Sequence, residues 1–190
     1  MAQRLTPLPP DQLSTDQRAV YDGITGGDRL KGTQHFPVVA PDGSLNGPFA
    51  IMAHVPGVGG ALQELGAAIR YRTSLTARVR EIGILLVATK LGSEFEWWAH
   101  ERVARAVGLD DAELAQLKQG AFSSTDPAEQ AAADLSVALL DNTAVTDEQF
   151  ARYRDVLGVQ AVVELTSLVG YYRTLAQLMA VFDIGIPTDA

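Results

Sequence analysis

One segment of the chain, EFEWWAHERVARAVG at residues 94–108, contains residue types that can move protons. Glu96 and His100 are four residues apart, so on a helix they lie on the same side. Ser93, seven residues before His100, joins that side if the helix reaches back so far. A carboxylate that orients an imidazole is a recurring device of general acid–base catalysis. The spacing therefore indicates a candidate acid–base site, with a histidine hydrogen-bonded in a packed interior as the alternative.

A second carboxylate stands out in the preceding segment, LTARVREIGILLVATKLG at residues 75–92. This segment is apolar over most of a helical circumference, which is typical of a central helix. Glu81 shares its side with apolar residues three, four and seven positions later. It is either a second group of the site or a structural ion-pair partner of Arg78 or Arg80.

The elements that position these residues are predicted to be helices. Capping patterns at Ser14, Asp110, Asp126 and Thr146, with glycines at helix ends, mark their boundaries. No alternating strand-like run with hairpin chemistry is present, so we expect an all-α fold. The expected helices cover residues 14–24, 57–72, 74 or 76 to 92, 94–107, 110–120, 126 onward, 146–158 and 159–183. Residues 25–56, rich in Gly and Pro, are expected to form an irregular arm with one short helix near residues 49–53.

Composition excludes several classes of function. A chain of 190 residues predicts one domain, residues 1–190 including the arm. The net charge of −8 and the lack of a Lys/Arg run argue against nucleic-acid binding. No apolar stretch is long enough to span a membrane, and the N-terminus has no apolar signal core, so a cytoplasmic protein is expected. The chain has no cysteine, which excludes disulfides and thiolate catalysis.

Three segments, in order, resemble the carboxymuconolactone decarboxylase family. LNGPFAIMAHVP at residues 45–56 is similar to the family's GPF segment, and the Arg-x-Arg-Glu sequence that ends at Glu81 resembles the helix before the family signature. The signature itself is aromatic-Glu-Trp-x-x-His followed by Ala and Gly at four-residue steps. Here it falls on Phe95, Glu96, Trp97, His100, Ala104 and Gly108.

The resemblance implies an alkylhydroperoxidase D-like bundle of about seven to eight helices. It also implies a homo-oligomer, a trimer or hexamer, with a pocket near subunit contacts. For the decarboxylase branch it implies loss of carbon dioxide from an anionic lactone with no cofactor. Redox members of the superfamily carry Cys-x-x-Cys, and those positions fall on Ser93 and Glu96, neither of them a thiol. A thiol peroxidase is therefore not expected, and Glu81 looks like the superfamily's upstream glutamate.

Decarboxylation needs hydrogen-bond donors at a carbonyl oxygen and one proton donor. We expect His100 to be the proton donor or shuttle, Glu96 its orienter and Glu81 a second acid–base group, acting on a carboxylated lactone by decarboxylation or isomerisation. A non-catalytic oligomeric scaffold or small-molecule binding protein remains the alternative. The candidate substrate-binding residues are His54, Arg70, Arg72, Arg78 and Ser93.

Two further interpretations concern the same segment. Trp97 and Trp98 are expected to serve in core or interface packing, as large aromatic residues usually do, with at most one as a pocket wall. Glu96 and His100, one turn apart, also have a spacing that suits a metal. With three histidines and no cysteine, the chain does not obviously supply the further ligands, so no metal is expected.

Overall fold

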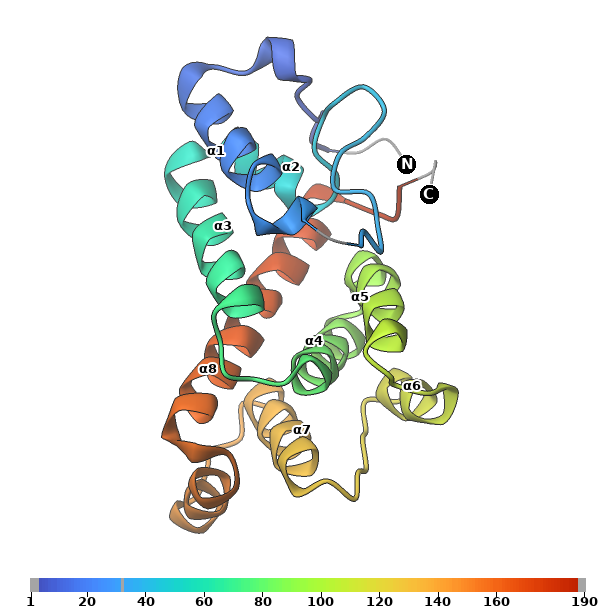
Figure 1. Ribbon diagram of the computed structural model, residues 1–190, viewed down its shortest axis with the longest axis vertical. Coiled ribbons are helices and arrows are strands. Elements are labelled where there is room, and N and C mark those ends of the chain that lie inside the picture. Colours follow the sequence, from blue (N-terminus) through green and yellow to red (C-terminus); the bar gives the residue numbers. More distant parts are fainter. Residues whose placement is uncertain (1–3, 32, 188–190) are drawn as a thin grey trace. The chain divides into compact units, whose positions relative to one another are not determined.

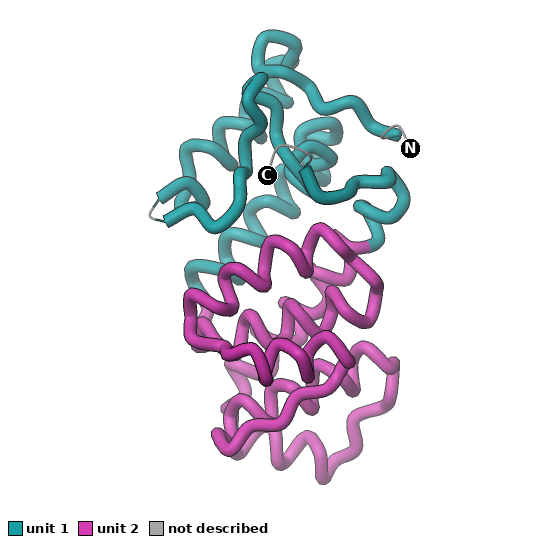
Figure 2. The backbone as a smooth tube through the Cα atoms, turned by 90° about the vertical axis from the view of Figure 1, so that its right-hand side faces the viewer, with its two compact units in different colours: residues 1–72, 177–190 teal, residues 73–176 magenta. Residues whose placement is uncertain are grey.

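The computed structural model describes residues 4–31 and 33–187. Their regular structure is helical, apart from one isolated antiparallel bridge between Val39 and Leu45 (Figure 1). The all-α prediction is therefore confirmed. The chain divides into two compact units, residues 1–72 with 177–190 and residues 73–176 (Figure 2).

The first unit is built around three packed α-helices. They are α1 (Thr15–Thr25), α2 (Pro48–His54) and α3 (Pro56–Tyr71), accompanied by the short 3-10 helices η1 (Pro10–Gln12) and η2 (Asp28–Leu30). The predicted capping box is present, because Ser14 and Gln17 each accept a hydrogen bond from the other's backbone N–H. Within the described part of the arm, the short helix predicted near residues 49–53 is α2, whose residues 48–53 are all buried.

Gly59 sets how closely α2 and α3 approach each other. A Cβ built at this position would lie 1.9 Å from the backbone oxygen of Met52 in α2. Because a backbone atom cannot rotate away as a side chain can, a larger residue would force the two helices apart. The contact therefore requires glycine.

We expect Gly59→Ala to lower the free energy of unfolding by about 1–3 kcal/mol, the range for overpacking. Gly57→Ala is the matched control on the same helix, since its Cβ would meet nothing within 4 Å. That control should be neutral or slightly stabilising. Urea unfolding of both variants measures the difference, and equal stability of the two would refute the steric explanation.

The central helix of the second unit is α4 (Ala77–Leu91), as the mostly apolar circumference of this segment predicted. The helices α5 (Glu94–Ala106), α6 (Asp111–Lys118) and α7 (Pro127–Leu140) contact α4. From α8 (Asp147–Phe182), Leu165 and Leu168 lie against Gly83 of α4, where an added Cβ would come within 3.2–3.3 Å of both. Nine residues of α4 are buried, and Glu81 is among them.

The predicted boundaries of these helices are confirmed by their caps. Thr76 caps α4, Asp110 and Glu113 form a capping box at α6, and Asp126 caps α7 with Pro127 at its first position. At Gly158 the backbone has φ 80° and ψ 155°, which interrupts α8 where the sequence predicted one helix to end and the next to begin. No helix in the described part of the chain has both the length and the apolar character to cross a membrane.

Candidate active site

A glycine turn folds α5 back against α4. Gly92 adopts the left-handed conformation, with φ 63°, and ends α4. The next backbone N–H, from Ser93, donates to the oxygen of Ala88 at 2.9 Å, which satisfies a carbonyl that the helix end would leave open. The turn reverses the chain and brings His100 of α5 to Glu81 of α4.

His100 and Glu81 form a buried pair. The imidazole Nδ1 lies 2.7 Å from Glu81 Oε2, and the two side chains are only 7% and 3% exposed. A carboxylate only accepts hydrogen bonds, so Nδ1 carries the proton and donates it. Nε2 is then the nitrogen that gains and loses a proton as the ring changes charge. The arrangement can therefore shuttle a proton, with Glu81 stabilising the imidazolium form.

This geometry corrects one predicted role. The sequence suggested Glu96 as the group that orients His100, because the two share a side of α5. The imidazole Nδ1 instead donates its hydrogen bond to Glu81, nineteen residues earlier in the chain. Spacing along one helix could not reveal this contact, since the partner belongs to another helix.

Two tyrosines of α8 also belong to the surroundings of His100. The Tyr172 ring meets the imidazole edge-on, with centroids 5.2 Å apart and an interplanar angle of 89°. Tyr171 meets Tyr172 in the same way at 5.3 Å, and both tyrosines are buried. Together with Glu81, these rings restrict the orientation of the imidazole. Sequence analysis missed them, although two adjacent tyrosines in a largely apolar helix were a visible signal.

Glu96 is buried in a different manner. Its side chain is 2% exposed, and within the described residues neither carboxyl oxygen has a hydrogen-bond partner. Burial raises the pKa of Glu96 well above its usual range, because it disfavours the charged form. Burial therefore favours the neutral carboxylic acid over the carboxylate at this position.

The other residues in and next to α5 for which the sequence suggested a role are less buried than Glu96 and His100. Ser93 is the N-cap residue, but its side chain makes no capping hydrogen bond. Trp97 and Trp98 are half-buried rather than in the core. The Trp97 indole lies beneath the Lys118 ammonium, 4.1 Å from the ring centroid, and the Trp98 ring lies 4.5 Å from the Arg102 guanidinium. Both tryptophans thus pack against cations.

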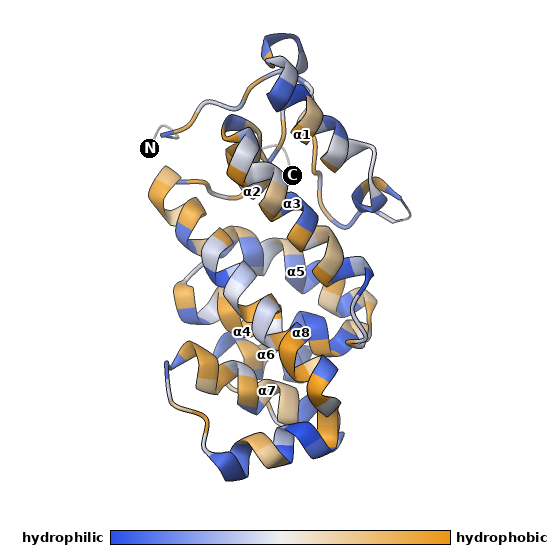
Figure 3. Ribbon diagram, turned by 90° about the vertical axis from the view of Figure 1, so that its left-hand side faces the viewer, coloured by the Kyte–Doolittle hydropathy of each residue, from blue (hydrophilic) through white to orange (hydrophobic). Residues whose placement is uncertain are grey.

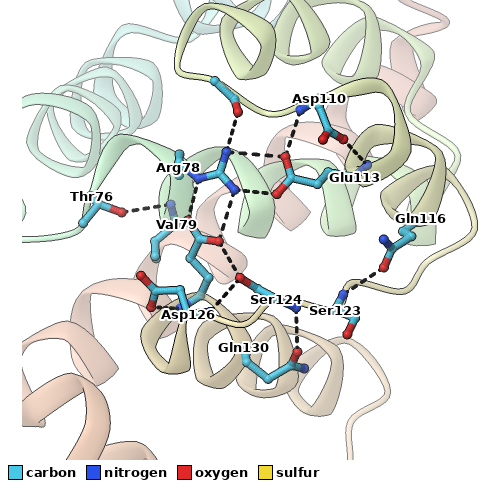
Figure 4. Close-up of polar contacts among 12 residues, drawn as sticks. Thr76, Arg78, Val79, Asp110, Glu113, Gln116, Ser123, Ser124, Asp126 and Gln130 are labelled. Atoms are coloured by element: carbon cyan, nitrogen blue, oxygen red, sulfur yellow. Dashed lines mark hydrogen bonds and ion pairs between the residues drawn. The ribbon is translucent and has the colours of Figure 1, made fainter.

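Arg78 is surrounded by acceptors from three other segments (Figure 4). Its Nε and Nη2 bind the two oxygens of Glu129 in α7, at 2.5 and 3.1 Å. Its Nη2 and Nη1 bind the two oxygens of Glu113 in α6, at 2.6 and 3.4 Å. Nη1 also donates to the backbone oxygen of Gly108 at 2.6 Å.

These contacts engage all five N–H groups of the guanidinium, so none is left for a substrate. The hydrogen bonds to Glu129 and Glu113 raise the pKa of Arg78, and the bond from Arg78 lowers the pKa of Glu129. These contacts give Arg78 a structural role, and its predicted part in substrate binding stays a prediction. Arg78 also has no N–H left for Glu81, and the alternative in which Glu81 pairs with Arg80 stays a prediction.

The remaining candidates for substrate binding belong to the first unit. Nε2 of His54 donates to the backbone oxygen of Thr6 at 2.8 Å. The Arg70 guanidinium lies 6.0 Å from the centroid of the Tyr71 ring, and Arg72 is the C-cap residue of α3. Their part in binding a substrate stays a prediction.

A pocket of about 330 Å³ lies at the C-terminal ends of α4, α6 and α7. None of the candidate site residues lines it. Its walls are Leu86, Thr89, Lys90, Gln119, Gly120, Val137, Leu140 and Asp141. In the described parts of the chain, no group of three or more acidic, histidine or cysteine residues is placed to bind a metal ion.

Comparison with known proteins shows what the segment that carries this site is similar to. Residues 56–138, which include Glu81, Glu96 and His100, match the model of the carboxymuconolactone decarboxylase family. No protein with curated annotation matches the chain.

Solved structures share the fold across nearly the whole chain. The alkylhydroperoxidase AhpD core of an uncharacterized peroxidase-related protein from Ralstonia eutropha JMP134 aligns with a TM-score of 0.74 and 13% identity, over 98% of this chain and 93% of that one. The debrominase Bmp8, as a cysteine-to-alanine variant with 2,3,4-tribromopyrrole, aligns with a TM-score of 0.71 and 16% identity, over 99% and 94%. These similarities confirm the alkylhydroperoxidase D-like fold.

Proposed function

We propose that this protein is a cytoplasmic, cofactor-free carboxy-lyase or isomerase that acts on a carboxylated lactone or a related small anionic compound. The observation that carries the proposal is the buried pair of His100 and Glu81, within the segment that matches the decarboxylase family. A histidine oriented by a carboxylate can transfer protons near neutral pH. The fold alone would not support this choice, because one fold hosts different chemistries.

The reaction requires one bond to break and one proton to be supplied. The bond between a ring carbon and its carboxylate breaks, carbon dioxide leaves, and the electron pair is delocalised onto the lactone carbonyl oxygen. His100 then protonates the carbon from Nε2, and Glu81 stabilises the imidazolium until that transfer. One proton is consumed per carbon dioxide released, and the imidazole regains it from solvent.

The chemistry of the two structural neighbours is not proposed for this chain. One is a debrominase and the other a peroxidase-related protein, and each shares only the fold with it. The absence of cysteine means that any reaction here proceeds without a thiol. Acid–base chemistry at His100 requires none.

The test is a panel of carboxylated lactones incubated with the purified protein. Carbon dioxide release and the NMR spectrum of the product distinguish decarboxylation from isomerisation. Turnover that exceeds the buffer rate supports the proposal. Tight binding without turnover would favour the alternative, a binding protein or scaffold. The specific argument for that alternative is the burial of both His100 and Glu81.

We extend the proposal to a homo-oligomer, a trimer or hexamer, because α8 leaves an apolar face uncovered. Hydrophobic residues, orange in Figure 3, occur along this helix. Val159 and Val163 are 57% and 59% exposed, and Ser167 and Gly170 continue the same side at helical spacing. An added Cβ at Gly170 would meet nothing within 4 Å, so a second helix can approach closely there.

We expect Val163→Glu to shift the assembly toward smaller species, with association weakened about tenfold or more by loss of a buried valine. Sedimentation velocity at micromolar concentration measures the change. Arg154→Gln removes a charge at an exposed position of α8 outside this face. It should therefore leave the assembly unchanged. A monomeric wild type under these conditions would contradict the proposal.

A further inference from the structure

The buried carboxyl of Glu96 takes no part in the hydrogen bond between His100 and Glu81. Both of its oxygens are sealed from solvent, and they have no hydrogen-bond partner in the described residues. No cation there forms an ion pair with it. Glu96 nevertheless lies one helical turn before His100, on the same side of α5.

Such a group is unfavourable unless it has a purpose or a missing partner. A buried polar group without a hydrogen bond costs free energy, and a buried charge without a partner costs more. The cost of the charge favours protonation of Glu96, since protonation removes the charge. The cost of the unpaired polar group remains, because a neutral carboxyl still has one O–H donor that is not used.

The unused donor fits the chemical demand of the proposed reaction. When carbon dioxide leaves, negative charge develops on the carbonyl oxygen, and a donor already in place and shielded from water stabilises that charge strongly. A buried neutral carboxylic acid is one known way to supply such a donor, as in the oxyanion hole of ketosteroid isomerase. A neutral group also avoids repelling an anionic substrate, which an ionised glutamate would do.

We infer that Glu96 donates a hydrogen bond, as a neutral acid, to the substrate oxygen that becomes negative. This rests on the proposed function for the nature of that oxygen. It replaces the role predicted from sequence, in which Glu96 orients His100. The two residues thus divide the work, since His100 moves the proton and Glu96 stabilises the charge. Because both oxygens are sealed in the free protein, the substrate must displace the side chains that cover them.

Infrared spectroscopy tests the protonation state without any activity. The difference between wild type and Glu96→Gln at neutral pH should contain the carbonyl stretch of a protonated carboxyl, which lies above the amide bands. Adding a slowly reacting carboxylated lactone should shift that band, because its O–H gains an acceptor. Carboxylate bands in its place, or a band that the lactone leaves unchanged, would overturn the inference.

Paired variants test the role in turnover. Glu96→Gln keeps a donor of similar size, so it should retain about a tenth or more of the wild-type rate. Glu96→Met keeps the size without the donor, so it should lose about a hundredfold or more, as for other oxyanion donors. If Glu96→Gln falls as low as Glu96→Met, the glutamate transfers a proton instead, and the inference is wrong.

The inference and the proposed function fail in different ways. A wild type that shows the carboxyl band and its shift, but turns over no lactone, would count against the proposed function only. A wild type that turns over lactones but shows carboxylate bands would count against the inference only. Circular dichroism of both variants confirms that each is folded before either result is interpreted.

Discussion

Replacing His100 by glutamine should lower turnover about a hundredfold or more, while the protein remains folded. Glutamine has a similar size and can hydrogen-bond to Glu81, but it cannot accept or release a proton near neutral pH. A positioned acid–base group contributes about 10²–10⁴-fold to a rate, so the loss should fall in that range. Measuring turnover and melting temperature on one preparation, with a lactone that the wild type accepts, separates catalysis from folding.

The matched control is His35→Gln, which makes the same change in the other compact unit. His35 has no assigned role, so its variant should keep the wild-type rate. A histidine that served only to fill the interior would produce the opposite pattern for His100→Gln. Stability would fall, and the folded fraction would retain full specific activity. That result would remove His100 from the mechanism.

Replacing Arg78 by methionine should destabilise the second unit by about 3 kcal/mol. The guanidinium joins α4 to α6 and α7, and its removal leaves the carboxylates of Glu113 and Glu129 without their cation. Loss of one partner from a buried ion pair costs about 3–5 kcal/mol. The lower end applies, because the Arg78 side chain is 28% exposed. Urea unfolding monitored by circular dichroism measures the effect.

Arg154→Met provides the comparison for a simple surface ion pair. Arg154 contacts Asp155 with side chains 49% and 65% exposed, so its removal should cost about 0–1 kcal/mol. Equal losses in the two variants would mean that the Arg78 contacts contribute no more than a surface pair. That outcome would contradict the structural role assigned to Arg78.

The same cluster should make the protein sensitive to acid. The hydrogen bond from Arg78 lowers the pKa of Glu129 below its ordinary value near 4.5, so this glutamate favours the folded state when ionised. Its contribution is complete above pH 4.5 and is lost as the pH falls through the lowered folded pKa. Unfolding free energies between neutral pH and pH 3 should therefore decline less in Arg78→Met than in wild type. Parallel declines would assign the acid sensitivity to other groups.

Local signals in the sequence predicted the helices well. Capping residues such as Ser14, Asp110 and Asp126 interact with the backbone two or three positions away. Both partners of each capping hydrogen bond therefore lie within one short stretch of sequence, where they can be recognised. The glycine at position 158 marked the interruption in α8 for the same reason, since its backbone conformation is local. The short helix within the arm was also expected, although its burial was not.

The partners of the site residues could not be predicted in this way. Glu81 reaches His100 across nineteen positions, and Arg78 reaches Glu113 and Glu129 across 35 and 51. Such contacts depend on how helices pack, which periodicity within one helix does not determine. The sequence therefore identified His100 and both site glutamates as candidates but assigned the orienting role to the wrong one.

The position of the tryptophans gives this protein a built-in optical reporter. The chain has two tryptophans, and both lie on α5, the helix that carries Glu96 and His100. Each indole is half-buried, with a cation over its face, so its emission responds to small changes in polarity and in the distance of that cation. Tryptophan fluorescence consequently reports on this one helix and on the cations that lie against it. A ligand titration can be followed in unlabelled protein.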